Sequence, residues 1–298
     1  MNNPIRHFRP LALSAIAVCA LASGCALSPP QKTAGTKFGA AAQTLGDLAA
    51  AEFKNSRDDV VEMRSLLKEL GDLNIDDSPD GLFTVDRVTV RTEASQALAK
   101  YGRLLGQLIG SSQVEQIRQA SDSLLGSLGG IEGVEVSREQ SQALSTVIAK
   151  VAGFLVEAKR KKAVNEIVPA MHEPIVQLFA AMKASFDPTD VQWSRAYGSV
   201  VQDLEEVATN VPSCSAQPPR TPCLTDQGQR RARALAAAKR QRFDEVSTKI
   251  LAAVEAVEEA HADLRNVLVN DEFFLSHLDT FVAQAEELAK IAAILEDQ

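Results

Sequence analysis

Residues that favour β-strands are scarce in this chain. Aromatic residues make up only 5% of its 298 residues, and the 16 glycines and 12 prolines are spread thinly. The abundant residues are alanine, leucine, glutamate, glutamine, lysine and arginine, which are strong helix formers. The composition therefore predicts an all-α protein, and a chain of this length can bury a sizeable core.

Long hydrophobic runs are also rare. Residues 11–22 form an apolar run that follows Arg6 and Arg9, with no acidic residue nearby. Such a run is too short to span a bilayer as a stable helix, and its flanking charge is typical of an export signal. No later segment has enough unbroken apolar residues to cross a membrane. The sequence therefore predicts an exported chain without a membrane-spanning helix.

A short motif follows the apolar run, Leu21-Ala22-Ser23-Gly24-Cys25. Small side chains fit the narrow site of a signal peptidase, and a cysteine thiol can receive diacylglycerol. The stretch resembles the lipobox of bacterial lipoproteins, although Ala22 stands where that family usually has leucine. The resemblance implies a cut before Cys25 and several acyl chains on this residue, since one chain alone holds only marginally. The alternative is an ordinary secretory signal with an unrelated cysteine.

The residue after Cys25 is Ala26 rather than aspartate. In lipoproteins of enteric-type bacteria this implies sorting to the outer membrane, where the protein would face the periplasm. Residues 27–36 contain two prolines and a glycine without a helical pattern, so we expect a short tether. The expected division is a signal peptide over 1–24, the lipidated cysteine and tether over 25–36, and a single helical-bundle domain over 37–298.

Positive charge is in deficit once the leader is removed. The leader holds two of the 31 lysines and arginines and none of the 39 acidic residues, which leaves a formal charge of −10 for the remainder. A nucleic-acid-binding protein would carry a basic surface, so no nucleic-acid partner is expected. The same charge argues against general attraction to an anionic membrane surface. We therefore expect the lipid bilayer to be reached through acyl chains on Cys25.

Only two cysteines lie beyond Cys19 of the leader and Cys25. Cys214 and Cys223 bracket a proline-rich loop in a chain that we expect to be exported, which predicts a disulfide. Closing this short loop would stabilise the fold by about 2–3 kcal/mol in the chain-entropy model. A redox or metal site is disfavoured because the spacing is not Cys-x-x-Cys and no histidine is near.

Apolar residues recur every three or four positions over residues 38–70, 243–268 and 274–295, which predicts helices with one buried seam. Caps and helix breakers predict further boundaries, with a kink or break at Pro169 and Pro174. The expected helices cover residues 36–74, 84–110, 112–128, 137–168, 187–211, a long stretch from 226, and a last helix capped by residues 270–272. We therefore predict an elongated antiparallel bundle with long, heptad-patterned helices.

Three glycines follow each other at intervals of four, Gly102, Gly106 and Gly110. A glycine inside a helix costs about 1 kcal/mol relative to alanine. Three such glycines on one helix face predict a neighbouring helix that approaches closely along this face.

Candidate metal ligands are sparse. Glu258 and His261 have the spacing found in carboxylate-bridged di-iron bundles, but such sites need a second pair, and neither His172 nor His277 has a glutamate three residues earlier. Residues 72–83 begin like a calcium-binding EF-hand loop and then lack its glycine and its final glutamate. We therefore predict no metal and no cofactor, and we expect His261 to meet a polar partner across the bundle.

Two basic clusters stand out against the acidic total. They are candidates for contacts with an acidic partner or with anionic headgroups, and the alternative is a solvated helix face paired with neighbouring acidic residues. The candidate contact residues are Lys159, Arg160, Lys161 and Lys162 in the first cluster, and Arg230, Arg231, Arg233 and Arg240 in the second.

The functional expectation is a membrane-anchored, non-enzymatic scaffold, adaptor or inhibitor that binds an envelope protein. No motif of a nucleophile elbow, zinc protease or phosphate-binding loop occurs in the sequence. Two alternatives stay open. One is a bundle that holds a small ligand or metal near His172, His261 or His277, and the other is a cell-wall hydrolase of an unrecognised type.

Overall fold

The computed structural model describes residues 26–70, 78–110, 115–116, 119–120, 122–124, 157–187, 193–214, 223–270 and 275–296. These residues are overwhelmingly helical, and within them the sole β-type pairing is an isolated bridge between Ser213 and Leu224. The predicted all-α class is confirmed. The helices are α2 (Pro29–Glu69), α3 (Val85–Gly110), α6 (Glu157–Ala170), α7 (His172–Phe186), α8 (Ser194–Asn210), α9 (Asp226–Asn270) and α10 (Ser276–Glu296).

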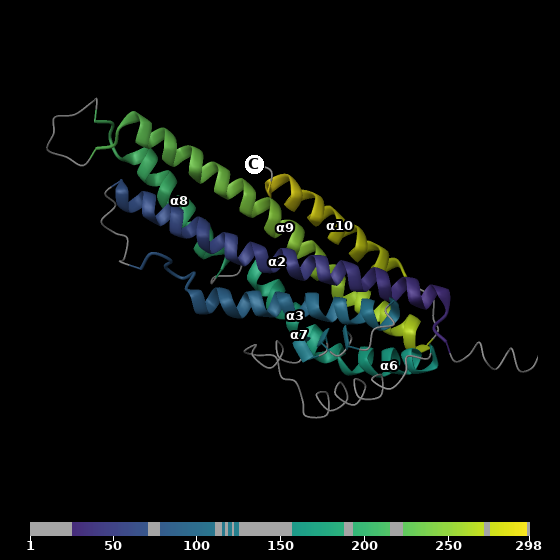
Figure 1. Ribbon diagram of the computed structural model, residues 1–298. Coiled ribbons are helices and arrows are strands. Elements are labelled where there is room, and N and C mark those ends of the chain that lie inside the picture. The colour runs from purple at the N-terminus through teal and green to yellow at the C-terminus, as the bar shows by residue number, and fades with distance from the viewer. Residues whose placement is uncertain are drawn as a thin grey trace, which may run out of the picture.

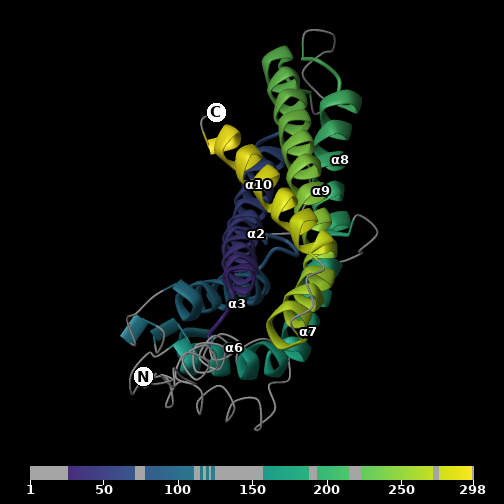
Figure 2. The same ribbon diagram turned by 90° about the vertical axis from the view of Figure 1, so that its right-hand side faces the viewer.

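Two long helices form the axis of the bundle. Helices α2 and α9 have 41 and 45 residues, which corresponds to about 60–70 Å each. They pack against each other, and α10 packs against both (Figure 1). Figure 2 shows α3 on one side of α2 and α9 with α8 on the other. The molecule is therefore elongated along the direction of α2 and α9.

The predicted apolar seams lie in one continuous core. On α2 the seam contributes Phe38, Leu45 and Phe53, and on α9 it contributes Ile250 and Val257, all of them buried. Burial of apolar surface at about 25 cal/mol per Å² is the dominant favourable term in such a core. None of the described helices is both long enough and apolar enough to cross a membrane.

The segment after Cys25 differs from the prediction. Residues 29–36 belong to α2, so the expected tether over this stretch is wrong. Ser28 caps the helix in a reciprocal pair, in which its hydroxyl accepts from the Gln31 N–H and its own N–H donates to the Gln31 side chain at 2.9 Å. The prolines that suggested a tether fall in the first helical turn, where proline is favoured because no backbone donor is needed. Leu27, just before the cap, is buried.

Other helix boundaries differ by a few residues. Helix α2 ends at Glu69, and the predicted break near Pro169 and Pro174 occurs at Met171, between α6 and α7. The last helix begins at Ser276, and the side chains of the predicted cap over residues 270–272 lie outside the described part of the chain. The carboxylate of Asp263 accepts from the backbone N–H groups of His277 at 3.0 Å and Leu278 at 3.3 Å.

The predicted disulfide is present between Cys214 and Cys223, whose Cα atoms are 4.9 Å apart. It lies between α8 and α9, next to the Ser213–Leu224 bridge. Ser213 also donates to Asp226 at the start of α9. These contacts hold the end of α8 against the beginning of α9.

Close approach of α3 to a neighbour is confirmed at one glycine of the predicted three. A Cβ on Gly102 would collide with the backbone of Gly39 and lie 2.7 Å from the backbone nitrogen of Gln43 on α2, whereas a Cβ on Gly106 or Gly110 would meet nothing within 4 Å. A second approach occurs where Gly46 of α2 faces Ser95 and Ala99 of α3. Glycines of α2, which the sequence pattern did not single out, therefore make half of this contact.

We expect Gly102→Ala to lower the free energy of unfolding by about 1–3 kcal/mol, because its methyl group would push α2 and α3 apart. The matched control is Gly106→Ala, one turn away, which should stabilise the helix by up to about 1 kcal/mol through helix propensity. Urea unfolding of both variants measures this. Equal effects of the two substitutions would contradict the close packing at Gly102.

Candidate functional site

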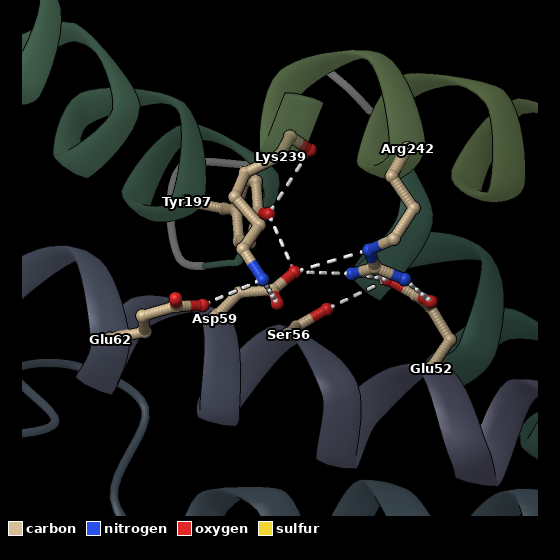
Figure 3. A network of polar contacts seen from close by, with 7 residues as sticks. All are labelled: Glu52, Ser56, Asp59, Glu62, Tyr197, Lys239 and Arg242. Carbon is tan, nitrogen blue, oxygen red and sulfur yellow. Dashed lines mark hydrogen bonds and ion pairs between the residues drawn. The ribbon is translucent and has the colours of Figure 1, made fainter. Parts of the chain in front are cut away.

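A buried ionic network joins α2 to α9 (Figure 3). Arg242 of α9 reaches two carboxylates of α2, with Nη1 2.6 Å from Glu52 Oε2 and Nη2 2.6 Å from Asp59 Oδ2. Both carboxylates are nearly inaccessible to solvent, since Glu52 is 2% exposed and Asp59 is 6% exposed. Charge-assisted hydrogen bonds of this geometry are among the strong ones in proteins.

Further side chains complete this network. Lys239 Nζ lies 2.6 Å from Asp59 and 2.8 Å from Glu62. Tyr197 of α8 donates to Asp59 Oδ2 at 2.9 Å, and Ser56 donates to Glu52 at 3.0 Å. Figure 3 shows these groups converging from α2, α8 and α9. Every carboxylate in the network is therefore held by donors from the chain itself.

The two carboxylates keep the Arg242 guanidinium of the network positively charged. Burial alone would lower the pKa of Arg242, but Glu52 and Asp59 outweigh it and raise the pKa above its usual value. Burial raises the pKa of Tyr197, and the charge of Asp59 raises it further. These groups use their hydrogen-bonding capacity on one another, and the arrangement therefore favours a structural role over a catalytic one.

A second group of polar side chains, linked by hydrogen bonds and called the histidine chain below, crosses the core at His261. Its Nε2 lies 2.7 Å from the Tyr101 hydroxyl oxygen of α3, and its Nδ1 lies 3.1 Å from Nδ1 of His172 at the start of α7. A neutral imidazole carries one N–H, so when Tyr101 donates to His261, His261 must donate to His172, and the direction can also be reversed. The expectation that His261 meets a polar partner across the bundle is confirmed.

Burial controls the titration of His261. The side chain is fully buried, and desolvation lowers its pKa to about 3, with smaller contributions from His172 and Arg265. The imidazole is therefore neutral at physiological pH. In this state the imidazole of α9 donates one hydrogen bond and accepts another, so it connects α3 and α7 to α9 without placing a charge in the core.

The remaining candidate ligand, His277, lies elsewhere. It is half exposed and contacts Asp263 at 3.2 Å and Glu259 at 3.5 Å. Its hydrogen bond to Asp263 raises the pKa of His277. The structure thus brings His172 and His261 together and leaves His277 apart, and the described residues contain no group of three or more side chains that could hold a metal ion. The EF-hand-like residues 72–77 lie outside the described part.

The two basic clusters occupy different ends of the bundle. Arg160 of the first cluster donates to the Ile109 carbonyl at the end of α3, and the second cluster lies in the first half of α9. Most of the second cluster contacts this chain: Arg233 donates to the Ala208 carbonyl at 2.9 Å and Arg240 pairs with Glu205 at 2.8 Å. Arg231 lies 4.0 Å from Glu69. Arg230 is exposed, as is Lys162, whereas Arg160 and Lys161 are partly buried, and the side chain of Lys159 lies outside the described part.

An open groove of about 780 Å³ runs between α8 and α9. Its floor is apolar, with Phe186, Tyr197, Val201 and Phe243 all buried, and the rings of Tyr197 and Phe243 stack at 4.0 Å. Exposed polar side chains flank the floor, among them Arg195, Arg240 and Asp244. An apolar floor with a polar rim is typical of a binding surface.

Two details leave room for an occupant in this groove. A Cβ on Gly198 would meet nothing within 4 Å. Ser247, 6% exposed, also lines the groove, and its hydroxyl has no hydrogen-bond partner within the described part of the chain. A buried hydroxyl without a partner is unfavourable by about 1–3 kcal/mol. The groove therefore offers space and an unused polar group together.

Little in the sequence indicates either the network or the groove. Glu52, Ser56 and Asp59 follow each other in steps of four and three, the same spacing as the apolar seam, so their position on a buried face could have been noticed. The groove has no motif, because it forms where side chains of α7, α8 and α9 meet. Only the packing of these helices places its walls.

Removing the cation of the network should be costly. We expect Arg242→Met to lower the free energy of unfolding by about 3–5 kcal/mol, because two buried carboxylates would lose their main partner. Arg230→Met, an exposed site on the same helix, should change stability by less than about 0.5 kcal/mol. Chemical denaturation measures both. A small effect of Arg242→Met would mean that the carboxylates are not held as charged groups.

Acid should destabilise the fold through His261. The unfolded imidazole binds a proton below its ordinary pKa of 6.5, whereas the folded one stays neutral down to about 3. This part of the stability is complete above pH 6.5 and is lost as the pH falls, by about 2 kcal/mol between pH 7 and pH 5. We expect His261→Gln to reduce that loss in urea unfolding. His277→Gln is the control and should not reduce it, because the pKa of His277 is shifted in the opposite direction.

Comparison with protein families, curated protein sequences and solved structures finds no match for this chain. Its function has to be inferred from its own residues. The side chains of the ionic network and of the histidine chain bond to one another, whereas the groove between α8 and α9 is open. The groove is therefore the candidate functional site.

Proposed function

We propose that the chain is a lipoprotein that is cut before Cys25 and held on the outer membrane by acyl chains on this residue, facing the periplasm. Its bundle acts without catalysis as a scaffold, adaptor or inhibitor. The partner is another envelope protein, which binds in the groove between α8 and α9. The single observation that carries the proposal is this open, apolar groove with a polar rim.

An amphipathic helix of the partner is the occupant that fits the groove. The wall on α9 extends from Arg240 to Leu251, which corresponds to about three helical turns. Apolar residues of an added helix would cover the floor while its polar residues face solvent, as in helix-in-groove recognition. Arg195 is exposed and has no ion pair within the described residues, so an acidic side chain on the partner would complement it.

The distribution of polar groups supports a non-enzymatic role. The residues lining the groove include no histidine or cysteine, and Asp244 is their single acidic residue. The carboxylates of Glu52 and Asp59 are engaged with Arg242 and are not among the residues that line the groove. General acid–base catalysis needs a positioned titratable group beside the substrate, and the groove offers one carboxylate on an exposed rim.

Photo-cross-linking in intact cells tests the groove. A photoreactive residue replacing Ser199, on the exposed rim, should trap one protein, and the cross-linked peptide should map by mass spectrometry to an amphipathic helix. Adding Gly198→Leu fills the space and should reduce the product at least about tenfold, which corresponds to the loss of about 1.4 kcal/mol of binding free energy. The control is Gly110→Leu, another glycine with open surroundings, which should leave the product unchanged.

Two results would overturn the proposal. A cross-link to a lipid or small molecule would favour the ligand-binding alternative. A product that persists with Gly198→Leu would show that the partner binds outside the groove. Release of the chain from membranes by Cys25→Ser is a separate measurement for the anchor.

A further inference from the structure

The charged side chains at the two ends of the groove between α8 and α9 pair within the chain. At one end, Arg240 of α9 lies 2.8 Å from Glu205 of α8. One helical turn beyond the lining at the other end, Lys183 of α7 lies 3.0 Å from Glu255 of α9. Each pair joins two helices and carries no net charge of its own. The ends of the groove therefore offer a partner little unpaired charge.

Two further charges flank the middle of the groove. Arg195 of α8 and Asp244 of α9 both line it, and both are exposed. Within the part of the chain that the structure describes, neither forms an ion pair, with the other or with any third residue. The α8 side of the groove thus presents a cation and the α9 side presents an anion, and both are available to a bound molecule.

A buried hydroxyl adds to the polar groups of the α9 side. Ser247 lines the groove three residues after Asp244, and residues with this spacing lie on one helix face with their Cβ atoms about 5–6 Å apart. Its hydroxyl has no hydrogen-bond partner among the described residues. A carboxylate accepts hydrogen bonds and a serine hydroxyl can accept one, while a guanidinium has several donors in a planar fork. An arginine of the partner therefore fits the α9 side, and a carboxylate fits Arg195 on the α8 side.

We infer that the groove binds its helix in one direction only, with an acidic flank of that helix along α8 and a basic flank along α9. This rests on the helix-in-groove binding of the proposed function. A helix whose apolar face covers the floor turns one flank to each side, and turning it end for end exchanges the flanks. The reversed helix would bring a basic residue to Arg195 and an acidic residue to Asp244, and such like-charge contacts are unfavourable.

The inference specifies the chemistry of the partner segment. Its apolar residues recur every three or four positions, glutamates or aspartates lie on one side of this apolar stripe, and arginines lie on the other. Charges that flank an apolar seam select partner and orientation in coiled coils in the same way. The apolar floor supplies contact area in either direction, so the flanking charges decide between the two directions.

Two designed peptides of identical composition test the direction. Each has about 14 residues, roughly four helical turns, with leucines on one face, glutamates on one flank and arginines on the other. The second peptide has the two flanks exchanged. A covalent staple on the outer face keeps both helical, because isolated helices of this length are marginal. Each carries a photoreactive group at its N-terminus and is cross-linked to the full-length chain purified from membranes.

The cross-linked positions report the direction of each peptide. The N-terminus of one peptide should map by mass spectrometry near Gln202, at one end of the groove, and that of the other near Leu251, at the opposite end. We expect each peptide to prefer its own end at least about fivefold, since two exposed pairs are gained and two like-charge contacts are avoided. About 0.5 M salt should reduce this preference.

A charge exchange in the chain makes the test specific. Arg195→Glu combined with Asp244→Arg exchanges the charges of the two sides without changing the net charge, and should reverse the direction of both peptides. The control is Arg230→Glu combined with Glu245→Arg. These residues are exposed on α9 outside the groove lining, and their exchange should leave both directions unchanged.

The outcomes separate the inference from the proposed function. Peptides that cross-link in the groove equally at both ends, or both preferentially at the same end, would overturn the single direction and leave helix binding intact. The same response to both double variants would also overturn it. If neither peptide cross-links in the groove, helix-in-groove binding itself is contradicted, and the inference fails with it.

Discussion

Two ion pairs, from Arg242 to the buried carboxylates of Glu52 and Asp59, constrain how the two longest helices, α2 and α9, pack together. A displacement of α2 along α9 by one turn would move these groups by about 5.4 Å and leave buried charges without partners. Apolar seams alone tolerate such shifts better, because leucine, valine and alanine replace one another at similar positions. The network thus fixes one register, and α3, α8 and α10 pack on the surface that this register creates.

Other features follow from that register. His261 lies about five turns beyond Arg242 on α9, where it meets Tyr101 of α3 and His172 of α7. Tyr197 connects the network to α8, and its ring stacks on Phe243 in the groove floor. The residues that hold α2 to α9 therefore also hold one wall of the candidate binding site. We expect damage to the network to disturb the groove even where partner-contacting residues are intact.

Charge is organised along the bundle as well as within it. The chain is acidic overall, and its two basic clusters lie at different ends of the bundle. In the proposed arrangement, lipid on Cys25 holds the protein at the membrane, and the groove binds a partner in the periplasm. Each of these roles uses a different part of the molecule, so each can be removed separately by the variants described above.

The sequence by itself determined the helical class, the buried seams, the disulfide between Cys214 and Cys223, and the break near Pro169. These depend on local periodicity, on helix propensity or on two cysteines close in the chain. It misplaced the beginning of α2, since prolines that break a helix interior are favoured in its first turn. Only the tertiary structure decided that Arg242 meets Glu52 and Asp59, that Gly102 meets Gly39, and that His261 lies between Tyr101 and His172. Such contacts join residues far apart in the chain, and the relative positions of packed helices, which local pattern does not encode, bring them together.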